Sequence, residues 1–345
     1  MWGALVSRPV IQLHRPWAPD PVAESVQVLS AAHGLAAHRS IDVLFRARRP
    51  VTPMALQRRH GHAPRSGLTV RVLPHNNTMA SAGFWAWVLR WWLRTEGHGI
   101  ALVRTPRYGL RAARAMPGLR IVAEVHGLAD PLLPDLLRHC AGAVCNSHGT
   151  ADGVARLAPA LPLAVLANAA RGPGPTLSGE GEGIGYVGSV RPEKGLEVLA
   201  ELAALIDEPV VLVTPDEDAA RRLGGALQVE PPLDPVDVPG RLARFRCLVV
   251  PLGPGRFGEV ETCPLKLFDS LASGRPVVVA DAPTLHEGIV PSWVPRYRMG
   301  DGSDLQRAVA IAIADAARFA AHRGTVRTWD DRGDELDGFL TEVCP

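Results

Sequence analysis

Lysine is almost absent from this chain, in which only two of the 37 basic side chains, Lys194 and Lys266, are lysines. Arginine serves wherever a generic surface cation is needed, so the two lysines stand out. Each follows a turn after an apolar, strand-like run. A compact, strongly hydrated ammonium group at the start of a helix suits a phosphate. The two positions therefore predict a phosphate site, and the alternative is two lysines retained by chance.

Cysteine is also scarce, and long apolar runs are missing. The five cysteines are odd in number, and no CxxC or histidine-rich spacing accompanies them. This pattern argues against a disulfide framework or a zinc site and predicts a reducing cytoplasm. No run reaches the roughly 18 apolar residues of a spanning helix, and the opening residues lack a signal-peptide core.

The composition is that of a folded protein with more than one domain. Hydrophobic residues make up 47% and charged residues 21% of 345 positions, which predicts two globular domains. Residues 1–170 carry 19 basic and 8 acidic side chains, whereas residues 171–345 carry 18 and 27. Either the two domains have different partners, with an anionic one for the basic half, or opposite charge helps the domains to close on each other.

The order of apolar runs predicts an α/β fold with two doubly wound, Rossmann-like domains that face each other across a cleft. A Gly/Pro-rich stretch at 171–182 reads as the linker between them. In the second half we expect strands at 184–187, 210–213, 247–250 and 276–279 and helices at 195–206 and 265–273. In the first half we expect strands at 10–13, 41–45, 68–73, 100–103, 121–125 and 143–145, a helix at 22–37, and at the end of the chain an acidic helix at 329–340 that packs back on the first domain.

One constellation of possible chemical residues lies between the expected strands at 247–250 and 276–279. Pro264 suits the first position of a helix, which leaves the next backbone N–H groups free. Lys266 in that first turn opposes the helix dipole unless an anion is bound there. Glu261 before the helix and Asp269 one turn inside it are placed to hold two hydroxyl-bearing parts of one ligand. The alternative is a surface helix with a Lys266–Asp269 ion pair.

A second constellation is the stretch from Gly185 to Gly195, in which a strand feeds a turn that opens a helix. It lacks the GxGxxG pattern, which argues against a dinucleotide site. Arg191 and Lys194 of this turn are placed to hold a diphosphate from the other side.

Together these stretches resemble the nucleotide-sugar domain of family 4 glycosyltransferases, which have the GT-B fold. The resemblance rests on Lys194-Gly195 after a Val-Gly strand end, and on Glu261 and Asp269 eight positions apart before Ala-Ser-Gly-Arg-Pro-Val-Val-Val. In the first half, Glu124-Val-His126 resembles the family's Glu-x-His strand end, and Asn168 lies where the family has an asparagine before the linker.

The resemblance implies an N-terminal acceptor-side domain at 1–170, completed by a closing helix at about 326–345, and a nucleotide-sugar domain at 183–325. It implies transfer of a hexosyl group from a nucleoside diphosphate sugar with retention of configuration, without a metal or other cofactor.

The resemblance also implies the roles of single residues. Glu261 would hold donor-sugar hydroxyls, Asp269 the ribose, and Arg191 and Lys194 the departing diphosphate, while His126 would reach the donor sugar. The remaining donor-binding residues would be Gly188, Ser189, Cys263, Leu265 and Lys266.

The sequence departs from the family pattern at three places. The family usually has Glu at the position of Asp269, and Arg at the position of Ser189, so that Arg191 would substitute. Its glycine-rich first loop is replaced by residues 16–25. Asp20, Glu24 and Ser25 of that loop are the acceptor-side candidates, and the acceptor itself, anionic or lipid-linked among the options, stays open.

The segment 84–94 holds four of the eight tryptophans together with Arg90 and Arg94. It predicts either a peripheral contact with the inner membrane face or a covered helix of the first domain. Together with the cysteine content, this predicts a cytoplasmic protein, and we expect no nucleic-acid partner.

Three other functions compete with glycosyl transfer. A nucleotide-sugar epimerase would share the architecture and need no acceptor. A non-catalytic GT-B binding subunit would account for Ser189, Asp269 and the missing glycine loop. A pyridoxal phosphate-dependent phosphorylase is disfavoured, since its Schiff-base lysine would compete with the phosphate role of the only two lysines.

Overall fold

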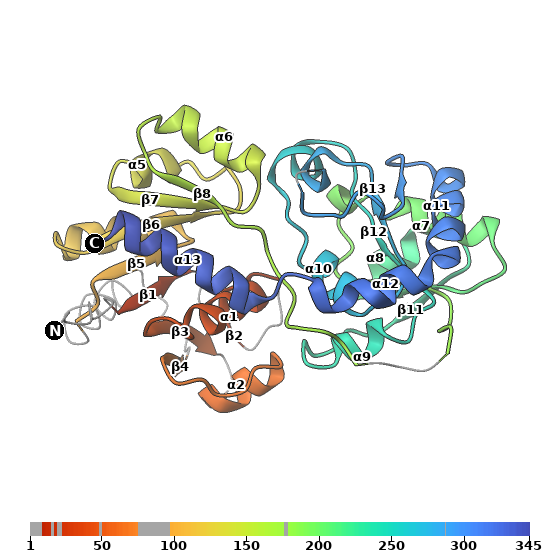
Figure 1. Cartoon of the computed structure of the whole chain (residues 1–345), viewed down its shortest axis with the longest axis horizontal. Coiled ribbons are helices and arrows are strands. Elements are labelled where there is room, and N and C mark those ends of the chain that lie inside the picture. The colour runs from red at the N-terminus through yellow and green to blue at the C-terminus, as the bar shows by residue number, and fades with distance from the viewer. Residues whose placement is uncertain are drawn as a thin grey trace. The chain divides into compact units, whose positions relative to one another are not determined.

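The computed structural model describes residues 9–14, 17–18, 23–47, 50–74, 97–175, 179–286 and 288–345. The chain divides into two compact units. The first comprises Met1–Ala167 and Trp329–Pro345, and the second comprises Asn168–Thr328. Each unit has one parallel sheet with helices packed against it (Figure 1). The predicted Rossmann-like α/β architecture is confirmed.

The sheet of the first unit has the strand order β2-β3-β1-β5-β6-β7-β8, with β4 on β3. Its strands are β1 (Val10–Leu13), β2 (Trp17–Ala18), β3 (Ile41–Ala47), β4 (Leu68–Pro74), β5 (Ile100–Val103), β6 (Arg120–Val125), β7 (Cys140–Cys145) and β8 (Leu163–Val165). Its described helices are α1 (Ala23–Leu35), α2 (Pro53–Arg59), α4 (Pro106–Ala115), α5 (Leu133–Leu137), α6 (His148–Leu157) and α13 (Trp329–Val343).

The sheet of the second unit has the order β11-β10-β9-β12-β13-β14. Its strands are β9 (Ile184–Val187), β10 (Val210–Val213), β11 (Leu227–Glu230), β12 (Cys247–Val250), β13 (Val277–Ala280) and β14 (Arg296–Tyr297). Its helices are α7 (Glu197–Leu205), α8 (Glu217–Arg222), α9 (Val238–Leu242), α10 (Leu265–Ala272), α11 (Gly302–Ala314) and α12 (Ala316–His322). Four single turns complete it: η2 (Pro192–Lys194), η3 (Phe257–Glu261), η4 (Pro283–Leu285) and η5 (Arg323–Thr325).

The inner strands of both sheets are buried on both faces, as continuous apolar runs predict. All four residues of β5, β10, β12 and β13 are buried. The sequence analysis missed β2, β8, β11 and β14, which lie at the ends of the strand orders of their sheets. An edge strand has a neighbour on one side only and stays partly exposed, so it needs no continuous apolar run and carries a weaker signal.

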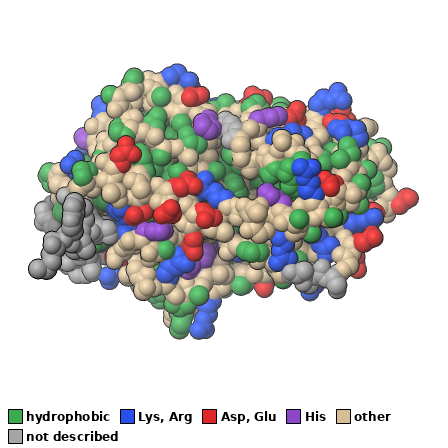
Figure 2. Space-filling view, viewed as in Figure 1, with side chains coloured by type: hydrophobic (Ala, Val, Ile, Leu, Met, Phe, Trp, Pro, Cys, Tyr) green, Lys and Arg blue, Asp and Glu red, His purple; other side chains and the backbone are tan. Residues whose placement is uncertain are grey.

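The predicted closing helix is confirmed as α13, which belongs to the first unit and packs on α1 (Figure 1). The two helices approach closely because glycines face each other: a Cβ added to Gly34 would lie 1.9 Å from the carbonyl oxygen of Trp329. Acidic side chains gather over α13 on the face shown in Figure 2. Two of them, Asp330 and Asp337, form ion pairs with Arg65 and Arg39 of the basic first half.

Candidate functional site

The predicted donor-site residues follow two neighbouring strands of the second unit. In its sheet, β9 lies between β10 and β12, so the strand order reverses there. Ligands of doubly wound sheets bind beyond the carboxyl ends of the strands at such a point. Lys194 lies in η2 after β9, whereas Glu261 and Lys266 follow β12.

The two lysines lie in one neighbourhood. Lys194 Nζ is 4.4 Å from the ring centroid of Phe257, and Lys266 Nζ is 3.8 Å from that of Tyr186. Burial lowers the pKa of Lys194 to about 8. Burial, and then the charge of Lys194, lower the pKa of Lys266 well below its usual range. Two partly buried ammonium groups that repel each other are unfavourable side by side, and a bound dianion would stabilise both.

The glycine after β9 makes room for one of these ammonium groups. Gly188 has φ +152°, and a Cβ added to it would lie 2.7 Å from Lys266 Nζ and 3.1 Å from Tyr186 Oη. Arg191 lies on the same loop, with 65% of its side chain exposed, and its guanidinium is 3.9 Å from the Glu193 carboxylate. Arg191 therefore has freedom to turn toward an incoming anion, while Lys266 is already placed.

Glu261 ends a single π-helical turn, a feature frequent at functional sites. Its carboxylate lies 2.6 Å from the Nε atom of Arg256, and 14% of the Glu261 side chain is exposed against 58% of the Arg256 side chain. The backbone that follows is held by Asn168. The Asn168 side-chain amide donates to the Cys263 carbonyl at 2.5 Å, and its backbone N–H donates to Cys263 Sγ at 3.2 Å.

The helix after this loop begins at Leu265, as expected, but Pro264 is its N-cap and not its first helical residue. Lys266 is therefore the second helical residue of α10. The Pro264 carbonyl accepts from the N–H of Leu267. The predicted placement of Lys266 in the first turn and of Asp269 one turn inside the helix is confirmed.

Asp269 pairs with an arginine that the sequence analysis placed in the linker. Arg171 Nη2 lies 3.1 Å from Asp269 Oδ2, and Arg171 Nη1 donates to the Pro235 carbonyl. Lys266 in turn donates to Tyr186 Oη at 2.6 Å. The alternative of a Lys266–Asp269 pair on a surface helix is therefore not the arrangement found. One oxygen of Asp269 is engaged by Arg171 before any ligand binds.

The first unit has its own polar cavity of about 300 Å³, lined by residues at and just beyond the carboxyl ends of β5 and β6 that include Arg104, Glu124 and His126. Glu124 is 2% exposed and accepts hydrogen bonds from three side chains. These donors are Gln12 at 3.1 Å, Gln27 at 2.9 Å and Arg332 at 2.9 Å. Burial by itself raises the pKa of the Glu124 carboxyl, but the nearby guanidinium groups of Arg332 and Arg104 outweigh it and hold that pKa well below its usual range.

His126 is a neutral imidazole in this cavity. Burial, and then the charge of Arg104, lower the pKa of His126 to about 4. Arg104 Nη1 lies 2.9 Å from His126 Nε2, and because a guanidinium only donates, Nε2 must accept. The Glu124 carboxylate is 3.6 Å from the same nitrogen, too far for a hydrogen bond. The proton of His126 therefore resides on Nδ1.

The acceptor-side candidates are only partly placed. Glu24 lines the cavity of the first unit, with its carboxylate 3.7 Å from Arg104 Nε. Ser25 is buried in the first turns of α1. Asp20 and the tryptophan-rich segment 84–94 lie outside the described residues.

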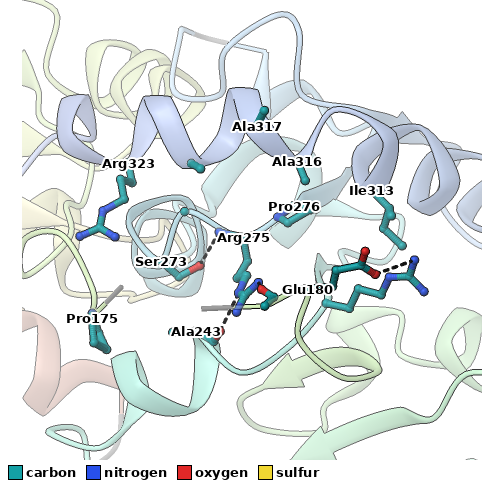
Figure 3. A pocket seen from close by; sticks show the side chains of 14 residues that line it. Pro175, Glu180, Ala243, Ser273, Arg275, Pro276, Ile313, Ala316, Ala317 and Arg323 are labelled. Carbon is teal, nitrogen blue, oxygen red and sulfur yellow. Dashed lines mark hydrogen bonds and ion pairs between the residues drawn. The ribbon is translucent and has the colours of Figure 1, made fainter. Parts of the chain in front are cut away.

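A larger cavity of about 440 Å³ lies elsewhere in the second unit (Figure 3). Its walls come from α12 and from residues that precede β12 and β13, such as Arg246 and Pro276. It therefore opens at the amino ends of those strands, and none of the predicted site residues lines it. Size alone does not mark the functional site of this protein.

The sequence analysis missed four residues that hold the predicted ones. Arg104 binds His126, Arg332 binds Glu124, Arg171 binds Asp269, and Tyr186 binds Lys266. Three of them are arginines, which are too frequent here to single out. Tyr186 had a signal, since it is one of only three tyrosines and lies two positions before Gly188.

Comparison with known proteins shows which proteins the second unit is similar to. Residues 181–319 match the family described as glycosyl transferases group 1. A GDP-mannose-dependent alpha-mannosyltransferase of Mycolicibacterium smegmatis is 32% identical over 165 residues, which are 46% of this chain and 43% of that protein. The resemblance to family 4 glycosyltransferases that the motifs indicate is thereby confirmed.

Solved structures extend the likeness of the fold to the whole chain. Anabaena Alr3699/HepE, solved in complex with UDP and glucose, has a TM-score of 0.70 at 14% identity and covers 97% of this chain and 100% of that chain. Sucrose-phosphate synthase from Thermosynechococcus elongatus has a TM-score of 0.64 at 15% identity, over 98% and 96% of the two chains. The predicted GT-B fold is confirmed. Among the described residues, no helix combines the length and apolarity needed to cross a membrane.

Proposed function

We propose that the protein is a glycosyltransferase that moves a hexosyl group from a nucleoside diphosphate sugar to an acceptor hydroxyl, with retention of configuration and without a metal. The observation that carries this proposal is the pair Lys194 and Lys266, brought together at the strand-order reversal of a group 1 glycosyltransferase domain. Two partly buried, mutually repelling ammonium groups in that place favour an anion, and the donor's diphosphate would supply it.

The chemistry follows from where charge develops. As the bond between the anomeric carbon and the phosphate oxygen breaks, its electron pair stays on the diphosphate. Lys194, Lys266 and Arg191 would stabilise that charge, aided by the free N–H groups at the start of α10. The acceptor oxygen bonds to the anomeric carbon, and its proton passes to the departing phosphate oxygen. No covalent intermediate with the protein is required.

Other residues would orient the donor. Glu261 would accept hydrogen bonds from sugar hydroxyls, and the backbone at Cys263 and Leu265 would lie beside the sugar. The Gly188–Ser189 turn would approach the diphosphate. Asp269 would use the oxygen left free by Arg171 to accept from the ribose. His126, neutral and with its proton on Nδ1, would donate to a sugar hydroxyl from the first unit.

GDP and UDP are the first nucleotides to test, because the mannosyltransferase relative is named for GDP-mannose and the Anabaena structure holds UDP. We expect one of them to raise the melting temperature, whereas ADP and CMP should have little effect. A ligand at about a hundred times its Kd stabilises by roughly 2.7 kcal/mol. If none of the nucleoside diphosphates or their sugar conjugates shifts the melting temperature, the proposed function is wrong.

A non-catalytic binding subunit is the second candidate, and the Arg171–Asp269 ion pair favours it, because Arg171 competes with the ribose for the carboxylate. Incubation with GDP-mannose or UDP-glucose and a panel of acceptors separates the two functions. Release of free nucleoside diphosphate indicates transfer or hydrolysis, whereas binding without release indicates a binding subunit. An isomerised sugar without free nucleoside diphosphate would instead reveal an epimerase.

The low pKa of Lys194 predicts a pH dependence of nucleotide binding. With a pKa of about 8, Lys194 is charged at neutral pH and loses its proton above pH 8 in the ligand-free protein. The diphosphate prefers the charged form, so affinity should fall as pH rises from about 7.5 to 9, by up to tenfold per pH unit for one lysine. Calorimetric titration of GDP or UDP measures this, with Lys194→Arg as the control, because a guanidinium keeps its charge. An equal decline in both proteins would contradict the assignment.

A further inference from the structure

Tyr186 of β9 connects the second lysine to the glycine turn through two hydrogen bonds. Lys266 Nζ donates to Tyr186 Oη at 2.6 Å, and Tyr186 Oη donates to the Ser189 carbonyl at 2.7 Å. A phenol has only one proton to donate. Because Tyr186 donates that proton to the Ser189 carbonyl, its oxygen can only accept the hydrogen bond from Lys266. The tyrosine is 1% exposed and therefore cannot easily exchange these partners for water.

The surroundings leave Lys266 few other partners. In the part of the chain that the structure describes, no carboxylate forms an ion pair with Lys266. Asp216, a carboxylate beside this turn, accepts from the N–H of Val190 at 2.8 Å and so is engaged by the same turn. Lys194 adds a repulsive positive charge. Among the described residues, Lys266 is therefore held by its contacts with Tyr186 and not by an ion pair.

Gly188 makes this position compatible with a close approach of a ligand. A Cβ on Gly188 would lie 2.7 Å from the ammonium and 3.1 Å from the phenol oxygen, inside ordinary contact distance. The backbone of the turn therefore lies directly against the Tyr186–Lys266 pair. A phosphate bound by the backbone of this turn would also contact the Lys266 ammonium group.

We propose that Tyr186 is a positioning residue of the diphosphate site, which holds the Lys266 ammonium against the Gly188–Ser189 turn. This inference rests on the proposed function, because it presumes that a nucleoside diphosphate is the ligand. The competing explanation is structural: the hydroxyl would join β9 to α10 and contribute to folding alone. The two explanations differ in whether the effect of the hydroxyl on binding depends on Lys266.

The test is a double-mutant cycle with Tyr186→Phe and Lys266→Met, read by calorimetric binding of GDP and UDP. We expect Tyr186→Phe to weaken binding about tenfold in the wild-type background, which corresponds to about 1.4 kcal/mol. In the Lys266→Met background the same change should have almost no further effect, since the positioned group is already gone. An unchanged affinity in the single variant, or an equal loss in both backgrounds, would overturn the proposal.

Tyr297→Phe is the matched control. Tyr297 lies in β14 of the same sheet, is also 1% exposed, and its hydroxyl is buried without a hydrogen-bond partner among the described residues. Removing that hydroxyl should leave nucleotide affinity unchanged. A tenfold loss for Tyr297→Phe as well would assign the effect to general loosening of the sheet and overturn the proposal.

A second measurement uses the wild-type protein and needs no variant to fold. Because the chain has only two lysines, selective ¹³C-lysine labelling gives two sets of ε-methylene signals. The Lys266 signal should be shifted by the ring current of Tyr186 and should move on addition of GDP or UDP. If GDP or UDP binds but the Lys266 signal does not move, this inference is wrong and the proposed function still stands. If the wild-type protein binds neither nucleotide, both are wrong.

Discussion

Replacing Glu261 with Gln is expected to lower the rate of sugar transfer by about 10²-fold or more while the protein stays folded. In the proposed function the Glu261 carboxylate accepts hydrogen bonds from donor-sugar hydroxyls. Each bond to a charged group contributes about 1.5–3 kcal/mol, and two of them correspond to at least two powers of ten. The ion pair of this carboxylate with the largely exposed Arg256 is a surface pair, so losing that pair should cost little stability. Release of nucleoside diphosphate at saturating donor measures the rate.

Glu259→Gln is the matched control for this prediction. Glu259 lies in the same turn, two residues away, is exposed, and accepts from the N–H of Gly255. The two variants make the same chemical change and alter net charge equally. Transfer that survives in Glu261→Gln, or falls equally in Glu259→Gln, would show that the donor sugar is held elsewhere.

Replacing Arg332 with Met is expected to lower the free energy of unfolding by about 3–5 kcal/mol, the usual cost of leaving one member of a buried ion pair alone. The side chains of Arg332 and Glu124 are each 1% exposed, and their 2.9 Å hydrogen bond joins α13 to β6. With Met at this position, Glu124 keeps the amide donors Gln12 and Gln27 but loses the adjacent counter-ion. Denaturant unfolding followed by tryptophan fluorescence measures the change.

The double variant Arg332→Met with Glu124→Gln tests the physical reason. It removes both charges, so it should recover much of the stability lost in the single variant. Arg307→Met breaks an exposed pair with Asp304 and should cost at most about 1 kcal/mol. Equal destabilisation by Arg332→Met and Arg307→Met would mean that the buried charge of Glu124 is not what makes Arg332 important.

Much of the fold is readable because its signals are local. The runs at 184–187, 210–213 and 247–250 coincide with β9, β10 and β12, since strands buried on both faces must be apolar throughout. The edge strands β11 and β14 carry no such requirement and were missed. The acidic composition of 329–340 predicts a helix that packs against a basic surface. In the structure, carboxylates of α13 form ion pairs with Arg39 and Arg65.

The charge difference between the two halves of the sequence has a different meaning in the structure. The α13 helix brings six carboxylates and one arginine to the first unit, so the charge of the basic half is partly neutralised inside that unit. Residues 1–170 therefore overstate how attractive this unit is to an anionic partner. Sequence order alone hides this, because α13 lies at the far end of the chain.

The sequence by itself was enough to predict the architecture and to single out the two lysines as candidate phosphate ligands. It also contained the motif that resembles glycosyltransferases. Local chemistry suffices there, because a buried strand or a rare residue is visible within a few positions. Only the tertiary structure decided which groups hold those residues: Arg104 on His126, Arg332 on Glu124, Arg171 on Asp269 and Tyr186 on Lys266. Such partners are set by folding over separations of 22 to 208 residues, and with 35 arginines of identical chemistry no local pattern distinguishes the one that reaches a given carboxylate or imidazole.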